Sequence, residues 1–322
     1  MTVKEKLVGL LEVNKGIFLS GEIIAEKLGV SRGAVWKAVK ALRGDGYDIS
    51  AVTNRGYCLS DETDKLSAAG IKKYLSDNNI DIEVYNAVTS TNSLARERAA
   101  EGASEELVVA AEAQSEGRGR LGRSFFSPRD TGLYISFLLR PKIHASEAVK
   151  ITTIAAVAVC EAIEAVSGEK AEIKWVNDVF VNGLKVCGIL TEASLSMENG
   201  GLEYAVAGIG INIYAPKSGF PDDLRGIVGA VIKKPVNDAR NRTAAELIQR
   251  FFGYYRKIES GEYAAEYKRR SFVIGKRINV ISAGKAFPAT AIDVDESCRL
   301  RVRYDDGREE LLSSGEISIR QL

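Results

Sequence analysis

The stretch GRGRLGR, residues 117–123, contains the spacing Gly-x-Gly-x-x-Gly. Whether this spacing belongs to a dinucleotide-binding domain decides which fold the sequence predicts. In a dinucleotide-binding α/β domain this spacing opens a helix directly after a strand, and an acidic residue ends the next strand. Here SFFSPRDTG, residues 124–132, follows with a proline and turn formers in place of a helical pattern. The next apolar run ends in LLRPK without a suitable Asp or Glu, so the sequence argues against a doubly wound nucleotide-binding fold.

The same stretch spaces three arginines, Arg118, Arg120 and Arg123, by glycines. Glycine lets the backbone approach a ligand closely, and guanidinium groups present fork-shaped donors that match carboxylate and phosphate. We therefore predict an anion-binding loop. A solvated basic loop or an RNA-binding Arg-Gly patch is the alternative, although the single copy and the flanking strands argue against low complexity.

The residues around this loop predict an α+β domain with a mixed sheet. Apolar runs of strand length accompany two helical patterns, and the later strands are joined by short Gly- or Asn-containing connections typical of hairpins. The second helical pattern is apolar nearly all round, which indicates burial against the sheet. Strands are expected at 82–88, 106–114, 132–140, 171–176, 178–182, 185–193 and 203–214, and helices at 91–100 and 147–168.

The first sixty residues predict a winged helix-turn-helix. Apolar residues at helical spacing mark three short helices, with Ser20 and Ser31 as N-caps of the second and third. Val35, Val39 and Leu42 would form the buried stripe of the third helix. Two β-type runs around the turn TNRG then supply a hairpin wing.

The third helix and the wing carry charge suited to DNA. Residues 1–60 hold nine basic and six acidic side chains, whereas the whole chain has a net charge of only +1. A helix that enters the major groove reads bases, while basic side chains meet phosphates. A winged domain used for protein contacts is the alternative, since basic helix faces are often only solvated. The candidate DNA-binding residues are Ser31, Arg32, Trp36, Lys37, Lys40 and Arg55.

The end of the chain predicts a helix followed by a small β-domain. Thr243 and Glu246 match a capping box near the start of the helical pattern. After Ser271 the apolar period becomes two, with turns at AGK, DES and DDG, which predicts a β-barrel of SH3-like size. The polar, aperiodic segment 60–70 is expected to be a linker. The predicted domains are 1–62, 67–270 and 271–322.

Composition narrows the remaining classes of protein. The 322 residues are 45% hydrophobic and 27% charged, as in ordinary globular proteins. The four cysteines are far apart in the sequence, which argues against a disulfide framework or a zinc site and predicts buried thiols. The single histidine, His144, is a poor metal ligand or triad member. Because the N-terminus lacks an apolar signal core and no run of ~20 residues is apolar without charge, we expect a cytoplasmic protein.

Three stretches together resemble the biotin protein ligase family: QSEGRGRLGRSFFSPRDTGLYISFLLRP at 114–141, KWVNDVFVNGLKVCGILTEA at 174–193 and VAGIGINI at 206–213. The winged helix-turn-helix makes the chain similar to the bifunctional members that also repress the biotin operon. The resemblance implies a catalytic domain of the biotin/lipoate ligase type and an AMP-forming reaction that uses ATP, Mg²⁺ and biotin. It also implies that the intermediate, biotinyl-5′-AMP, serves as corepressor.

The resemblance assigns roles to individual residues. It implies that Lys185 and Arg120 are catalytic, since a carboxylate that attacks a triphosphate needs fixed cations. Asn177 and Asp178 are candidates for contacts to Mg²⁺ or the ribose, although an Asn-Asp pair is also typical of a turn. The implied biotin-binding residues are Ser90, Thr91, Asn92, Gln114, Arg118, Gly119, Arg120 and Lys185.

Other positions match the family less closely. Phe125 stands where tryptophan is usual, and Val176 stands where proline is usual. Residues 214–235 correspond to a segment that folds over the adenylate. Glu316 and Arg320 match positions that support the ATP and carrier steps. Ser90 and Thr91 also suit a helix N-cap, and both roles are compatible.

The implied partners are biotin carboxyl carrier protein, whose lysine accepts biotin, and operator DNA, which a homodimer would bind. No membrane partner is expected. Two rival functions stay open: a biotin-sensing repressor without ligase activity, and a ligase of the same fold for lipoate. Intact Arg118, Arg120 and Lys185 count against the sensor, and the GRGRLGR loop with the fused winged helix counts against lipoate.

Overall fold

The computed structural model describes residues 2–77, 79–195, 201–234, 236–282 and 284–319. The chain divides into two compact units. One comprises Met1–Asn78 and Lys234–Ala245, and the other comprises Asn79–Lys233 and Glu246–Leu322. Within the described residues, no helix has both the length and the apolar character needed to cross a membrane.

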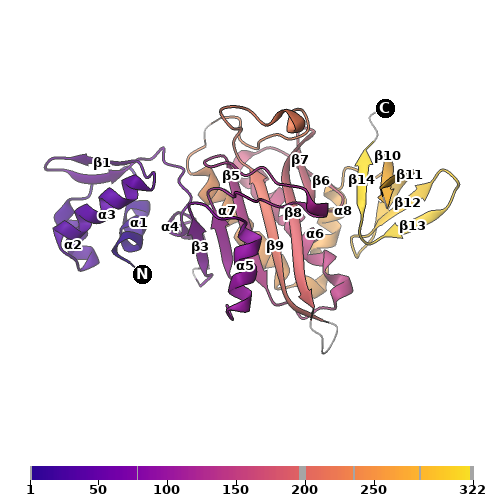
Figure 1. Ribbon diagram of the computed structural model, residues 1–322, viewed down its shortest axis with the longest axis horizontal. Helices are drawn as coiled ribbons and strands as arrows, with labels where there is room; N and C mark the ends of the chain where they lie inside the picture. The colour runs from indigo at the N-terminus through magenta and orange to yellow at the C-terminus, as the bar shows by residue number, and fades with distance from the viewer. Residues whose placement is uncertain (1, 78, 196–200, 235, 283, 320–322) are drawn as a thin grey trace. The chain divides into compact units, whose positions relative to one another are not determined.

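The first unit contains the predicted helix-turn-helix (Figure 1). Ser20 Oγ and Ser31 Oγ each accept a hydrogen bond from a backbone amide of the first helical turn, as N-caps do. The stripe Val35, Val39 and Leu42 is fully buried, which confirms that prediction. The elements are α1 Val3–Val13, α2 Gly21–Leu28, α3 Arg32–Gly44 and the antiparallel hairpin β1 Ile49–Val52 and β2 Gly56–Leu59.

The segment after the wing is packed and is not a free linker. It contains α4, Ala68–Lys72, and Leu66 is only 2% exposed. The Ser67 amide donates to Asn241 Oδ1, and Asn241 Nδ2 donates to the Lys65 carbonyl. The linker prediction for 60–70 is therefore wrong, because distant residues bury a segment whose own sequence shows no apolar period.

The long helix α7, Ala239–Tyr255, begins earlier than the sequence indicates. Thr243 lies inside the helix, so the predicted capping box with Glu246 is wrong. The helix instead begins next to Asp238, which is 3% exposed. Asp238 forms an ion pair with Lys15, whose Nζ lies 3.0 Å from Asp238 Oδ1. The Arg240 amide of the first turn donates to Asp64 Oδ1 at 3.0 Å, so a residue distant in sequence contacts this end of the helix.

The second unit is built on a seven-stranded mixed sheet (Figure 1). Its strands are β3 Ile82–Tyr85, β4 Val108–Ala111, β5 Gly132–Leu139, β6 Ala171–Lys174, β7 Asp178–Val181, β8 Leu184–Leu195 and β9 Leu202–Asn212. The order is β3-β4-β5-β9-β8-β7-β6. The β3–β4 pair is parallel and the other pairs are antiparallel, which confirms the expected mixed sheet and hairpins.

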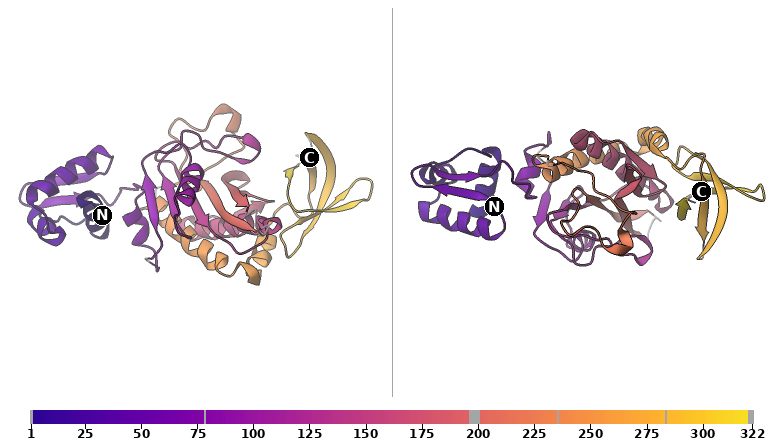
Figure 2. Two further views of the ribbon diagram at one scale, coloured as in Figure 1. Left: turned by 60° about the horizontal axis from the view of Figure 1, so that its bottom comes forward. Right: turned by 90° about the horizontal axis from the view of Figure 1, so that it is seen from above.

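Helices cover both faces of this sheet (Figure 2). Successive side chains of a strand point to opposite faces. On β5, Ser136 bonds to Asn92 of α5, Thr91–Ala100, while the neighbouring Phe137 stacks on Phe251 of α7 at 4.3 Å. The helix α6, Val149–Ser167, contacts β6, β7, β8 and β9. The face that meets α5 is the one on which the candidate site lies.

The C-terminal part is an antiparallel sheet of five strands that follows the helix α8, Glu262–Arg270. The strand order is β13-β12-β11-β10-β14, and the predicted period-two pattern is confirmed by alternating burial. The turns at DES and DDG fall at the expected positions, and the expected AGK turn includes Ala283, which lies outside the described residues. The strands are β10 Arg277–Ser282, β11 Lys285–Val294, β12 Leu300–Tyr304, β13 Glu309–Leu312 and β14 Glu316–Ile319.

Candidate active site

Glycines keep one face of the central sheet bare. Gly188 on β8 pairs with Gly210 on β9, and Gly208 lies two residues before Gly210 on the same face. A Cβ atom on Gly208 would lie 1.9 Å from Asn92 Oδ1, and one on Gly210 would lie 2.4 Å from the Phe125 ring. The start of α5 and the residues after the arginine loop thus rest directly on the strands.

A hollow of about 20 Å³, room for about one water molecule, lies between this face and the start of α5. The Thr91 amide and hydroxyl donate to Gln114 Oε1 at 2.9 and 3.1 Å, and Gln114 Nε2 donates to Ser127 Oγ at 3.0 Å. Ser136 Oγ donates to Asn92 Oδ1 at 2.7 Å. The structure thereby brings together the predicted residues Ser90, Thr91, Asn92, Gln114 and Arg118.

Two details of this hollow differ from the expectation. Ser90 is the N-cap residue of α5, but within the described residues its side chain makes no capping hydrogen bond. Gln114 takes that role because it accepts from the Thr91 amide. Ser127 and Ser136 are residues that sequence reasoning missed. Ser136 carried a signal, since it is a polar residue in the otherwise apolar strand 132–139.

The arginine loop is closed at its base by backbone hydrogen bonds. The Phe125 amide donates to the Gly117 carbonyl, and the Gly119 amide donates to the Arg123 carbonyl, both at 2.7 Å. A Cβ atom on Gly117 would lie 2.4 Å from the Phe125 carbonyl oxygen. Glycine at 117 therefore allows the two ends of the loop to meet, while Gly119 supplies an amide to the turn.

Arg118 and Arg120 point toward different parts of the site. Arg118 Nη2 donates to Ser93 Oγ at 3.0 Å and lies 3.3 Å from Glu192 Oε2. Arg120 Nη1 donates to Asn177 Oδ1 at 3.0 Å. The loop therefore presents one guanidinium at the small hollow and another beside the predicted Asn177–Asp178 pair.

The loop also contacts the C-terminal sheet. Arg120 Nη2 donates to the Gly315 carbonyl at 2.8 Å, and Arg123 forms an ion pair with Glu316 at 2.7 Å. Glu316 thus lies at the site, as the resemblance implies for its position. Arg320 lies outside the described residues.

Lys185 reaches the glycine-lined face through an irregularity in β8. The pairing of β7 with β8 shifts by one residue around Val186, and such a bulge redirects the neighbouring side chain. Lys185 Cε consequently lies 3.5 Å from the position of a Cβ on Gly188. Lys185 Nζ is 2.7 Å from Asp178 Oδ1, with the two side chains 29% and 19% exposed. The predicted lysine and aspartate form an ion pair facing the cavity.

A larger cavity of about 240 Å³ adjoins the hollow, and the two share Arg118, Phe125, Gly188 and Leu190 in their walls. Its polar side carries the loop arginines, Lys185 and the 177–178 pair. Part of its apolar lining comes from the segment 214–235, for which the sequence named no individual residue. Those wall residues are Phe220, Leu224, Ile227 and Val228.

Lys174 is a wall residue of this cavity that sequence reasoning missed. Burial lowers the pKa of Lys174, while the carboxylate of Asp178 opposes that shift and the Lys185 ammonium adds to it. Lys174 pairs with Asp178 across the β6–β7 hairpin. The signal was present in the sequence, since Lys174 stands two residues before the Val176 of the KWVND stretch.

Magnesium would find few protein ligands here. Among the described residues, there is no group of three or more His, Cys, Asp or Glu side chains placed to hold a metal ion. Asn177 already accepts a hydrogen bond from Arg120 and donates one to the Ile189 carbonyl. Asp178 is therefore the carboxylate of the predicted pair in the cavity wall, and its Oδ1 pairs with Lys185.

The candidate DNA-binding residues lie on α3 and the wing. Arg32, Lys37 and Lys40 are exposed, and Trp36 is 55% exposed, which is unusual for an indole. Arg55 lies over the Phe18 ring at 4.1 Å. Ser31, also a candidate, caps α3, because its hydroxyl accepts a hydrogen bond from the Ala34 amide.

Family models of known proteins match the parts of the chain that carry the candidate active site and the candidate DNA-binding residues. Residues 84–212 match the model of the biotin/lipoate A/B protein ligase family. Residues 3–58 match a helix-turn-helix domain, and residues 273–320 match the biotin protein ligase C-terminal domain. The three matched segments contain the arginine loop, α3 with the wing, and the C-terminal sheet.

Relatives cover most of the chain. The bifunctional ligase/repressor BirA of Bacillus subtilis is 37% identical over 70% of this chain and 70% of its own length. The BirA of Escherichia coli is 29% identical over 99% and 98% of the two chains. A biotin protein ligase structure from Aquifex aeolicus shares the fold, with a TM-score of 0.64 at 24% identity over 75% of this chain and 99% of that one. The chain therefore belongs to the family of BirA bifunctional ligase/repressor proteins.

Proposed function

We propose that this protein joins biotin to ATP to form biotinyl-5′-AMP, transfers biotin to a lysine of biotin carboxyl carrier protein, and represses transcription in response to biotin. The observation that carries the proposal is the continuity of two cavities on one sheet face. A small hollow lined mainly by uncharged polar side chains, with Arg118 at its rim, adjoins a larger cavity lined with cations, and this division suits a biotin ring and an adenylate.

The first step joins two anions. A carboxylate oxygen of biotin attacks the α-phosphorus of ATP and pyrophosphate leaves. Lys185 and Arg120 are the proposed catalytic cations, because they reach the cavity from β8 and from the arginine loop. Fixed cations in a pocket shielded from water stabilise charge that develops on the phosphoryl oxygens. When biotin binds, its carboxylate would replace Asp178 as the partner of Lys185.

The hollow has room for about one water molecule, so its walls must move apart to admit biotin, but the polar groups that they carry suit the neutral head of biotin. A cyclic urea offers N–H donors and one carbonyl acceptor, which the hydroxyls of Ser90 and Thr91 and the amides of Asn92 and Gln114 can satisfy. Arg118 and Gly119 would cover the bound ring, and Phe125 would form an apolar wall. In the transfer step, the acceptor lysine attacks the acyl carbonyl and AMP leaves.

Mg²⁺ is proposed to enter with ATP. This ion usually takes one or two carboxylates plus substrate phosphates, and Asp178 supplies the one carboxylate of the proposed pair. When bound, Mg²⁺ would neutralise phosphate charge. The chain's own residues would position the nucleotide, with Asn177 holding Arg120 in place.

Repression is proposed to use a homodimer that places two winged domains on a two-fold operator. Exposed Arg32, Trp36, Lys37, Lys40 and Arg55 would contact DNA, and Ser31 would set the start of α3. We also propose the domain division 1–62, 67–270 and 271–322. The strand order β13-β12-β11-β10-β14 supports an SH3-like barrel for the last domain.

The test is ATP-dependent transfer of radiolabelled biotin to a purified biotin carboxyl carrier domain. Wild type should transfer biotin, and Lys185→Ala should bind biotin weakly and transfer little. Arg120→Gly removes the other proposed catalytic cation and should lower the rate of adenylate formation, and with it the transfer of biotin. If wild type binds biotin and transfers none, the protein is a sensor; if it transfers lipoate in preference, it is a ligase for another acid.

A further inference from the structure

Glu192 lies behind the small hollow without lining it. It follows Gly188 and Leu190 at intervals of two along β8, so its side chain points to the same glycine-lined face. The sequence offered no reason to select Glu192, because its importance depends on which strand face meets α5.

The Glu192 carboxylate fixes the orientation of the Asn92 amide. Asn92 Nδ2 donates to Glu192 Oε2 at 2.8 Å and to the Leu190 carbonyl at 3.2 Å. A carboxylate and a carbonyl accept hydrogen bonds only, so the nitrogen of Asn92 must face β8. The oxygen of Asn92 then faces Ser136 and Gly208 on the neighbouring strands.

The same carboxylate gathers two arginines. Arg118 Nη2 lies 3.3 Å from Glu192 Oε2, and Arg96 Nη1 lies 3.2 Å from Glu192 Oε1. Arg96 belongs to α5 and Arg118 belongs to the arginine loop. One side chain therefore connects the helix that carries Asn92 with the loop that borders the hollow.

We propose that Glu192 is a positioning residue for the biotin subsite: it orients the Asn92 amide from behind the hollow and holds Arg118 at its rim. This inference rests on the proposed function. Glu192 does not line the larger cavity and reaches its wall only through Arg118, which the two cavities share, so its loss should affect biotin more than the nucleotide.

The test compares Glu192→Ala with wild type by calorimetric binding of biotin and by the KM values for biotin and ATP. Loss of a hydrogen bond to a charged partner should weaken biotin binding about tenfold or more, with a smaller change in the KM for ATP. Glu203→Ala is the matched control, since Glu203 is an exposed residue of β9 whose carboxylate accepts a hydrogen bond from Ser194, away from Asn92 and Arg118. That control should bind biotin as wild type does.

A second pair of variants tests the orientation of Asn92 and does not depend on truncating Glu192. Asn92→Asp places two carboxylates together and should abolish measurable biotin binding. Adding Glu192→Gln to Asn92→Asp restores a donor and an acceptor at this contact. The double variant should bind biotin at least fivefold more tightly than Asn92→Asp alone.

The outcomes separate the two proposals. If wild type does not bind biotin, the proposed function fails. If wild type binds biotin and Glu192→Ala binds equally well, or if KM for ATP rises as much as KM for biotin, the role of Glu192 is overturned. Failure of Glu192→Gln to improve on Asn92→Asp alone would overturn the proposed orientation.

Discussion

Gly208 is the residue at which the central sheet leaves least room, because a Cβ there would lie 1.9 Å from Asn92 Oδ1. Gly208→Ala must therefore push Asn92 away from Ser136 and Glu192. We expect the free energy of unfolding to fall by about 1–3 kcal/mol, as for overpacked cores, and biotin binding to weaken at least tenfold. Denaturant unfolding and calorimetry would measure the two effects.

Gly253→Ala is the matched control for that substitution. Gly253 lies in α7, and a Cβ there meets no described atom within 4 Å. Alanine is a better helix former than glycine, so this variant should be unchanged or more stable by up to about 1 kcal/mol. If both variants bind biotin as wild type does, the glycine-lined face does not define the biotin subsite.

Some site residues could be identified from the sequence because they belong to recognisable motifs, whereas others act only through contacts that the fold creates. Lys185 and Gln114 belong to long stretches that resemble the ligase family, so the sequence identified them. Ser127 and Glu192 act through contacts that depend on the path of the loop and on which strand face meets α5. A single sequence does not reveal a register, because sliding a strand by one residue exchanges its two faces.

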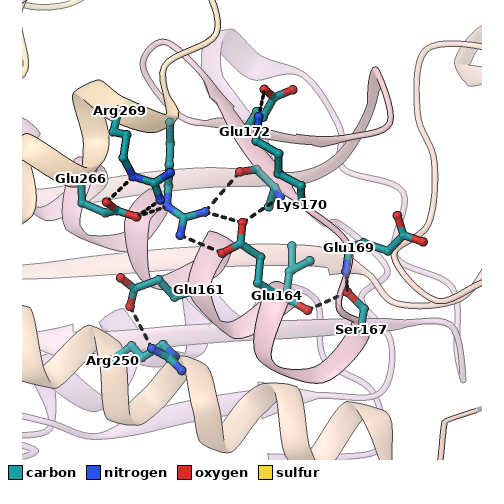
Figure 3. A network of polar contacts seen from close by, with 12 residues as sticks. Glu161, Glu164, Ser167, Glu169, Lys170, Glu172, Arg250, Glu266 and Arg269 are labelled. Atoms are coloured by element: carbon teal, nitrogen blue, oxygen red, sulfur yellow. Dashed lines mark hydrogen bonds and ion pairs between the residues drawn. The ribbon is translucent and has the colours of Figure 1, made fainter.

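At the scale of elements, Arg270 on α8 connects α8 with α6 and β6. Figure 3 shows two of the carboxylates of this network, Glu164 and Glu266. The Arg270 guanidinium donates to Glu164 of α6 at 2.6 and 2.8 Å, to Glu266 at 2.6 Å and to the Ala171 carbonyl of β6. The Arg270 side chain is 6% exposed. Arg270→Met would remove hydrogen bonds to two partly exposed carboxylates and should cost about 1–3 kcal/mol of unfolding free energy.

The neighbouring Arg269 provides the comparison. It also bonds to Glu266, but its side chain is 60% exposed. Exposed ion pairs contribute about 0–1 kcal/mol, so Arg269→Met should change stability by less than about 1 kcal/mol. Thermal or urea unfolding would measure the free energy of unfolding of both variants. Equal destabilisation by the two substitutions would contradict the prediction that the buried arginine contributes more to stability than the exposed one.

The same network predicts a pH dependence. The hydrogen bond from Arg269, followed by that from Arg270, lowers the pKa of Glu266 from 4.5 to about 2. A carboxyl with a depressed pKa in the folded state stabilises the protein above its unfolded pKa, and that stabilisation is lost as pH falls toward the folded pKa. Unfolding free energy should therefore decline between about pH 4.5 and 2. Because solvent screens a partly exposed group, we expect Glu266 to contribute about 1 kcal/mol of this decline.

Glu266→Gln isolates that contribution. Glutamine does not titrate, so the variant should lose less stability than wild type over the same pH interval. Urea midpoints at a series of pH values would measure both slopes, and parallel curves would show that Glu266 does not retain its low pKa in solution.

Element boundaries show where local sequence was insufficient. The caps of α2 and α3 were predicted because Ser20 and Ser31 act on amides three residues away. The segment 60–70 and the start of α7 were not, since Asn241 and Lys65 meet across 176 residues of chain. Local signals identify contacts that are close in sequence, and only the folded chain shows the others.

At the scale of the whole molecule, the proposed adenylate has two uses. It is the substrate of the transfer step, and it would also favour the dimer that binds the operator, since a ligand shifts a population only through preferential binding to one state. An acceptor carrier domain should therefore lower operator occupancy by consuming the adenylate.

The experiment measures operator binding by fluorescence anisotropy with biotin and limiting ATP, before and after addition of an unbiotinylated carrier domain. Occupancy should fall as biotin is transferred and recover when fresh ATP is supplied. The same carrier already biotinylated is the control, because its acceptor lysine is blocked and it consumes nothing. Equal loss of operator binding with both carriers would show that occupation of the ligase by its partner, and not consumption of the adenylate, releases the DNA.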